Sequence, residues 1–271
     1  MNFLLEPLTY QFMQRGLLAS VIVGVLCAVM GTYVVLRGMA FLGDAMAHAI
    51  LPGVAIAYIF KGDLLIGAGV AAVAVALIIG LFSKGGAVKE DTAIGIMFAA
   101  ALSLGVALIS TMQTYAVDLS HILFGNVLGV SPSDLWLIGG LSFAILLTVG
   151  LLFKPFLVIS FDPVLAATLR LPAELLRNLM LVLLALTVVV SLQTVGVSLA
   201  AAMLVTPAAT AYLLTRRLLP MMLVSALVGA LSSIVGLYLS YYFNIVSGSA
   251  IVLTATLFFL LAFLWKRLRG A

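Results

Sequence analysis

Apolar runs of about 20 residues recur along the whole chain, and each is long enough to cross a bilayer as an α-helix. Of the 271 residues, 65% are hydrophobic and only 8% are charged, which leaves too little polar surface to cover a water-soluble domain. A transmembrane β-barrel would instead alternate apolar and polar residues in segments of about ten. We therefore predict an all-α polytopic membrane protein, built as a single transmembrane domain over residues 1–271.

The runs predict about nine transmembrane helices, and eight remain possible because the sixth and seventh lie close together. Residues 1–15 are too polar to span, so we expect an external interfacial segment there. The expected spans cover residues 16–36, a run ending at residue 60, and residues 64–82, 94–112, 135–153, 175–193, 197–214, 219–242 and 250–265. Gly16, Gly24 and Gly31 lie near one stripe of the first span, which would allow a neighbouring helix to pack closely.

The basic residues are distributed unevenly between the two sides of this topology. With nine spans and a cytoplasmic C-terminus, 11 of the 13 Lys and Arg residues face the cytoplasm, and only Arg15 and Lys61 face outward. The cytoplasmic set is Arg37, Lys84, Lys89, Lys154, Arg170, Arg177, Arg216, Arg217, Lys266, Arg267 and Arg269. This asymmetry follows the positive-inside rule and predicts an external N-terminus. Because the basic residues are dispersed between spans, they do not indicate nucleic-acid binding.

Ionisable residues within the second span are the strongest functional signal. Asp44 and His48 are four residues apart, so on a helix they share one face. A carboxylate at membrane depth is costly and requires compensation. A carboxylate oxygen and an imidazole nitrogen suit divalent metals such as Mn²⁺, Fe²⁺ and Zn²⁺. Pro52 also deprives the carbonyl of His48 of its helical donor. The pair is therefore either a metal site or a structural contact between helices.

Two stretches between spans carry further candidate residues. The longest, residues 113–134, contains Asp118, His121 and Asn126, which we expect at the external mouth. Asp118 and His121 could bind metal or could be solvated loop residues. Asp162 and Pro163 are typical of a helix start, so residues 162–171 predict a short cytoplasmic helix between two spans.

The remaining sequence features restrict the classes of chemistry. The single cysteine, Cys27, excludes an internal disulfide and a thiolate metal cluster. The glycines after Lys84 do not complete a phosphate-binding loop, because Gly86 occupies the position of its lysine. We therefore predict that the chain is not itself an enzyme and carries no cofactor of its own.

Together, these landmarks resemble the membrane permease of bacterial zinc, manganese and iron importers of the ATP-binding-cassette class. The matching stretches are residues 36–44 (Leu-Arg-Gly-Met-Ala-Phe-Leu-Gly-Asp) running through His48 to Leu-Pro-Gly at 51–53, Leu-Phe-Gly-Asn at 123–126, Phe-Asp-Pro at 161–163, Gln-Thr-Val-Gly at 193–196 and Leu-Val-Thr-Pro-Ala-Ala-Thr at 204–210. The resemblance covers essentially the whole chain. It implies a fold similar to that of the vitamin B12 importer permease, less one N-terminal helix.

The resemblance also implies partners and residue roles. A permease homodimer would work in the bacterial plasma membrane with two cytoplasmic ATPase subunits and an external solute-binding protein. Asp44 and His48 would contact the metal in transit. The short helix, within residues 160–172, would meet the ATPase. Its expected contact residues are Asp162, Pro163, Leu165, Ala166, Leu169 and Arg170. In the family this helix often ends in Ala-Leu-Gly-Leu-Pro, whereas Arg170 here replaces the glycine.

The function favoured by these features is the permease of an ATP-driven divalent-metal importer. The alternative is an ion-coupled secondary metal carrier that uses Asp44 and His48 as a proton relay. Such carriers often contain inverted repeats, and we find none in the sequence. A non-transport scaffold would leave Asp44 unexplained. The run from His121 to Asn126 looks more like manganese and iron members than zinc members, so we favour manganese.

Overall fold

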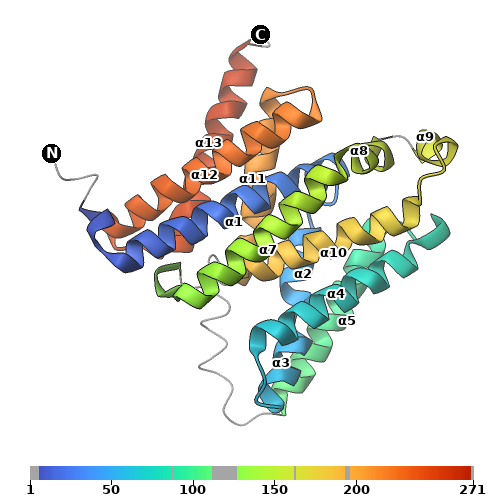
Figure 1. Ribbon diagram of the computed structural model, residues 1–271, viewed down its shortest axis with the longest axis horizontal. Coiled ribbons are helices and arrows are strands. Elements are labelled where there is room, and N and C mark those ends of the chain that lie inside the picture. Colours follow the sequence, from blue (N-terminus) through green and yellow to red (C-terminus); the bar gives the residue numbers. More distant parts are fainter. Residues whose placement is uncertain (1–5, 87, 112–126, 162, 193–195, 270–271) are drawn as a thin grey trace.

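The protein is helical throughout the residues that the structure, a computed structural model, describes: 6–86, 88–111, 127–161, 163–192 and 196–269 (Figure 1). In chain order the elements are η1 (Pro7–Thr9), α1 (Gln11–Leu36), α2 (Leu42–Ala49), α3 (Leu51–Ile59), α4 (Leu64–Phe82), η2 (Lys84–Gly86), α5 (Glu90–Ser110), η3 (Val127–Gly129), α7 (Pro132–Leu151), α8 (Phe153–Phe161), α9 (Pro163–Thr168), α10 (Ala173–Leu192), α11 (Val197–Leu214), α12 (Leu218–Phe243) and α13 (Ser247–Arg269). The prediction of an all-α protein is confirmed for these ranges.

Eight segments of the described chain are long and apolar enough to cross a membrane. They are α1, α2 together with α3, α4, α5, α7, α10, α12 and α13. The apolar part of α11, Ala200–Leu214, is shorter. It nevertheless packs against α1, α2, α12 and α13. The predicted range of eight to nine spans therefore agrees with the structure. The count is eight without α11 and nine if α11 also crosses the membrane.

Helix α1 lies at the centre of the bundle and packs against α7, α10, α11 and α12 (Figure 1). The predicted glycine stripe makes this packing possible. A Cβ atom at Gly24 would lie 2.8 Å from the carbonyl oxygen of Gly229 on α12, and one at Gly31 would collide with the backbone of Leu204 on α11. Because these glycines let the backbones approach, the Ser233 hydroxyl can donate to the carbonyl of Ser20 on α1, 2.8 Å away.

Two helix boundaries differ from the sequence expectation. Helix α1 already begins at Gln11, so part of the expected interfacial segment is helical. After α7 the chain continues as α8, where a connection between spans was expected. Pro155 lies in the first turn of α8, where a missing N–H costs no helical hydrogen bond. The ring of Phe156 then packs edge-on to Tyr33 of α1, with centroids 5.9 Å apart.

Candidate functional site

Asp44 and His48 lie one turn apart on α2. The Nε2 atom of His48 is 3.7 Å from Oδ1 of Asp44, which is too long for a hydrogen bond. The side chain of Asp44 is 43% exposed and that of His48 is 28% exposed. The two groups therefore lie close together, as their spacing predicted, but they do not satisfy each other and both reach space outside the packed chain.

The membrane segment that carries this pair is broken directly after it. Helix α2 ends at Ala49, helix α3 begins at Leu51, and Ile50 joins them. Pro52 cannot donate to the carbonyl of His48. The N–H of Ile50 lies beside that carbonyl, but a donor only two residues further along the chain does not replace the helical hydrogen bond that Pro52 removes. Broken helices at membrane depth are tolerated where the irregular backbone is buried in protein or lines a cavity.

Close packing fixes the position of α2 on two sides. On the α11 side, a Cβ atom at Gly43 would lie only 3.1 Å from Cα of Ala201. On the α5 side, the ring of Phe98 lies edge-on to the imidazole of His48, with centroids 5.8 Å apart. The same ring lies edge-on to Phe41, with centroids 5.4 Å apart. Phe98 is therefore a neighbour of the site that sequence reasoning missed, because α2 and α5 are distant in the chain.

An ion pair lies beside the start of α2, at the turn that leads from α1 into it. Nη2 of Arg37 is 2.7 Å from Oε2 of Glu90, the first residue of α5, and both side chains are mostly buried. Burial lowers the pKa of Arg37 below its ordinary value; Glu90 opposes this shift and Arg177 adds to it. The pair ties α1 to α5. In the sequence, the only indication of this ion pair is that Arg37 ends the first expected span and Glu90 precedes the fourth.

Arg177 of α10 closes the adjacent end of α4. Its two Nη atoms donate to the carbonyls of Gly80 and Ser83, at 3.0 and 3.2 Å. These carbonyls belong to the last turn of α4, where intrahelical donors are missing. Lys84 and Glu174 form an ion pair with an N–O distance of 3.2 Å. Both side chains are largely exposed, so the pair contributes little to stability. The ends of α1, α4, α5 and α10 are thus held together at one face of the bundle.

The arrangement of these helices matches that of known transport proteins. The chain matches the ABC 3 transport family over residues 9–266. It belongs to this family. It is 47% identical to the manganese transport system membrane protein MntC of Halalkalibacterium halodurans, over 98% of this chain and 91% of that protein. It is 39% identical to a probable iron transport system membrane protein of Haemophilus influenzae, over 99% of this chain and 98% of that protein.

A solved structure supports the same assignment. The chain superimposes on PsaBC from Streptococcus pneumoniae, solved in complex with Fab, with a TM-score of 0.84 and 42% sequence identity. The match covers 97% of this chain and 94% of that chain. As a member of the ABC 3 transport family, the chain is a multi-pass membrane permease.

The short helix expected between two spans of this permease is α9. Val164 and Leu165 of α9 are exposed, and so is Leu169 directly after it, whereas Ala166 is only 1% exposed. Ala166 therefore packs against its own chain in this structure, and its place in the contact with the ATPase remains a prediction. Pro163 begins α9, and Asp162 lies outside the described residues.

Arg170, at the position where the resembled family often has glycine, lies in the turn that follows α9. Arg170 has a φ angle of 51°, in the left-handed region that glycine adopts freely. Its N–H donates to the carbonyl of Ala167, and the next N–H, of Leu171, donates to Ala166, both at 3.0 Å. Such a turn ends a helix with a residue in the left-handed conformation. Arg170 keeps this geometry at a conformational cost.

The predicted external-mouth residues Asp118, His121 and Asn126 lie outside the described residues. Within the described ranges, no group of three or more His, Cys, Asp or Glu side chains is arranged to hold a metal ion. Asp44 and His48 are therefore a two-residue candidate site in a single copy of the chain.

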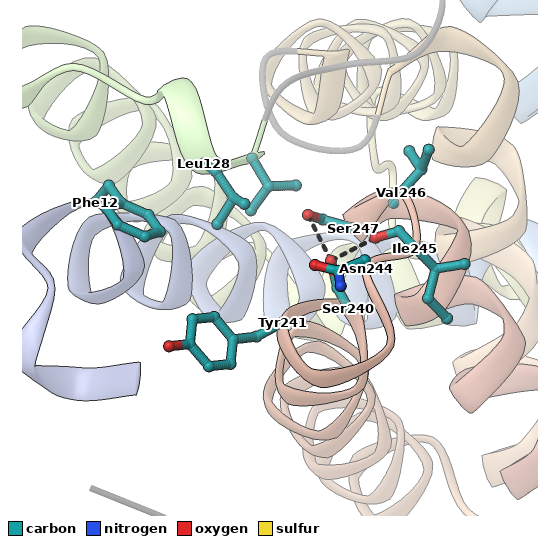
Figure 2. Close-up of a pocket in the computed structure, with 10 residues that line it drawn as sticks. Phe12, Leu128, Ser240, Tyr241, Asn244, Ile245, Val246 and Ser247 are labelled. Carbon is teal, nitrogen blue, oxygen red and sulfur yellow. Dashed lines mark hydrogen bonds between the residues drawn. The ribbon is translucent and has the colours of Figure 1, made fainter. Parts of the chain in front are cut away.

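A cavity of about 760 Å³ opens at the other end of the bundle, between the turn joining α12 to α13 and the first turn of α1 (Figure 2). The Ser240 hydroxyl donates to the carbonyl of Ile245 at 2.7 Å and lies 3.0 Å from the Ser247 hydroxyl. Asn244 forms the turn in a left-handed conformation. None of the described residues that line this cavity carries a charged side chain.

Proposed function

We propose that this permease imports a divalent transition metal, with Mn²⁺ as the favoured ion, and that Asp44 and His48 bind it in transit. The observation that carries the proposal is the 3.7 Å separation of two partly exposed, potentially ligating groups on a broken membrane helix. A purely structural pair would be expected to bond within about 3.2 Å. A bound dication would also offset the cost of placing the Asp44 carboxylate at membrane depth.

The ligand types restrict the choice of metal. One carboxylate and one imidazole suit Mn²⁺, Fe²⁺ and Zn²⁺. Cys27 is buried in α1 and supplies no thiolate that would favour a softer ion. The name of the manganese relative at 47% identity supports Mn²⁺ as the favoured ion. A transit site must also release its cargo, so few protein ligands are expected.

Two copies of the chain would complete the pathway. A two-fold axis brings the same surface patch of each copy together, so the partly exposed pair of one copy would face the pair of the other. Four protein ligands from two copies, supplemented by water, would suit an ion that accepts oxygen-rich octahedral coordination. The solute-binding protein would deliver the metal from outside, and the ATPase subunits would drive its passage into the cytoplasm.

The orientation follows from the distribution of basic residues. Placing Arg37, Lys84 and Arg216 on the cytoplasmic side places Lys61 outside. This orientation puts α9 in the cytoplasm, where it would contact the ATPase. The exposed apolar side chains of Val164, Leu165 and Leu169 would fit a groove on that subunit.

Metal uptake by the assembled transporter tests this function. Asp44→Asn keeps the shape of the side chain and removes its charge, so uptake of Mn²⁺ should be abolished while the amount of folded protein is little changed. Full-rate uptake by the folded variant would refute the metal site. Uptake that continues without ATP hydrolysis but stops when the proton gradient is collapsed would favour a secondary carrier instead.

A further inference from the structure

A basic pocket of about 290 Å³ lies where α1 and α11 end, beside the end of α8 and the start of α12. Its polar lining is formed by Arg216, Arg217, Thr215 and Tyr212, and its apolar lining includes Leu36 and Phe161. Among the described residues, the lining contains two positive charges and no carboxylate. It differs in this respect from the Arg37 region, where Glu90 compensates the arginine.

The two arginines of this pocket have no anionic partner in the part of the chain that the structure describes. Neither Arg216 nor Arg217 forms an ion pair or a side-chain hydrogen bond with another described residue. Both arginines are exposed and line the same pocket, so an anion bound there would interact favourably with two positive charges. Arg217 also precedes α12 without a side-chain cap, which leaves the positive end of that 26-residue helix directed at the same place.

The rest of the lining indicates an amphiphilic anion. Leu36, Phe161 and Met221 offer apolar surface beside the arginines, and the exposed ring of Tyr212 lies at the end of a membrane helix. Aromatic residues are enriched at this depth, where the hydrocarbon region meets the headgroups. A free phosphate ion would use the guanidinium groups and leave the apolar walls unused.

We propose that this pocket binds the phosphate group of an anionic phospholipid from the cytoplasmic leaflet. Guanidinium groups match phosphate oxygens with paired hydrogen bonds, and basic pockets between membrane helices are known to hold anionic headgroups. The choice of leaflet rests on the orientation proposed above. Because Phe161 is the last residue of α8, the bound lipid connects the start of α12 to the segment that leads into α9.

Native mass spectrometry of the purified full-length permease tests the proposal. The protein is titrated with phosphatidylglycerol or with phosphatidylcholine, which has no net charge. We expect a retained phosphatidylglycerol molecule in the wild type. In the double variant Arg216→Gln/Arg217→Gln, phosphatidylglycerol binding should weaken about tenfold or more, because two charge-assisted contacts are lost. The matched control Lys266→Gln/Arg267→Gln removes two cations at the end of α13, outside the pocket, and should retain the lipid.

Three results would overturn the proposal. Equal weakening in the two double variants would indicate general attraction to the membrane surface. Displacement of the lipid by equimolar inorganic phosphate would indicate a site for the free ion. Unchanged lipid binding with loss of the ATPase subunits from the pocket variant would assign the arginines to that partner.

Further controls keep this test independent of folding and of the transport proposal. If the glutamine variant fails to fold, Arg216→Lys/Arg217→Lys keeps both charges and loses the paired geometry. It should bind the lipid several-fold more weakly than the wild type, and unchanged binding would contradict the proposal. The measurement involves no metal, so its outcome is separate from a failure of the uptake assay.

Discussion

The phenyl ring of Phe98 on α5 stands at 69° to the imidazole ring of His48 on α2, with the ring centroids 5.8 Å apart. Phe98 also contacts Phe41 edge-on, so it links the residue before α2 to the candidate ligand within it. Contacts of this kind restrict the rotation of the imidazole. The orientation of His48 is therefore set by a different helix from the one that carries it.

Replacement of Phe98 by leucine should weaken metal uptake through His48. An edge-on aromatic pair contributes about 0.5–1.5 kcal/mol beyond its buried area, so the KM for Mn²⁺ should rise by roughly two- to tenfold. The maximal rate should change less. Phe143→Leu on α7 is the control, because Phe143 is 68% exposed and should leave both parameters unchanged. An unaltered KM for the Phe98 variant would contradict the proposed role of its ring.

The Arg37–Glu90 ion pair should contribute strongly to stability. Glu90→Gln leaves the mostly buried charge of Arg37 without compensation, and loss of one partner from a buried pair typically costs about 3 kcal/mol. A clear drop in the thermal unfolding temperature in detergent is the expected result. The exposed pair of Lys84 and Glu174 provides the comparison, and Glu174→Gln should have almost no effect. Equal effects of the two variants would refute this ranking.

Much of this architecture follows from local sequence patterns. The predicted span over residues 64–82 coincides with α4, since its apolar run starts directly after the helix-capping residue Asp63. The shared face of Asp44 and His48 follows from helical periodicity alone. The external-mouth residues remain a prediction.

Features that depend on packing between distant segments could not be predicted in the same way. Arg37 and Glu90 are 53 residues apart, and nothing local identifies them as partners. Helix α8 was not predicted, because the expected fifth span ended at residue 153; Pro155 lies in the first turn of α8, where proline is tolerated. The burial of Ala166 depends on how α9 folds back onto the bundle, which the periodicity of so short a helix does not specify.

Arg170→Gly should stabilise the end of α9. A residue other than glycine in the left-handed conformation costs about 1 kcal/mol, and this cost is partly offset because glycine is more flexible when unfolded. Slower hydrogen exchange of the α9 amides would report this local gain. Arg170→Ala removes the charge and keeps a Cβ atom, so it should not slow exchange. Equal slowing in both variants would assign the effect to charge rather than backbone conformation.

The orientation can be tested with single cysteines in a Cys27→Ala background. In intact cells, a membrane-impermeant maleimide should label Lys61→Cys and should not label Lys84→Cys until the membrane is permeabilised. The expectation rests on the excess of basic residues on the side that contains Lys84. The reverse labelling pattern would invert the topology and would place α9 outside the cell.

The proposed contact between α9 and the ATPase can be tested by adding a charge that does not disturb the helix. Val164 lies in the first turn of α9 and is 76% exposed, and an acidic residue in the first turn is favourable to the helix dipole. Val164→Asp should therefore insert and fold normally. Because the charge would be buried on docking, the variant should lose co-purifying ATPase and metal uptake together.

A matched substitution separates docking from a general effect of surface charge. Leu175 lies in the first turn of α10 and is 67% exposed, so Leu175→Asp makes a similar change outside α9. It should retain the ATPase. Ala166→Trp would be a poorer probe, because Ala166 is buried and the indole ring would disrupt the fold from within. Normal uptake and normal ATPase binding by the Val164 variant would show that the exposed face of α9 is not the docking surface.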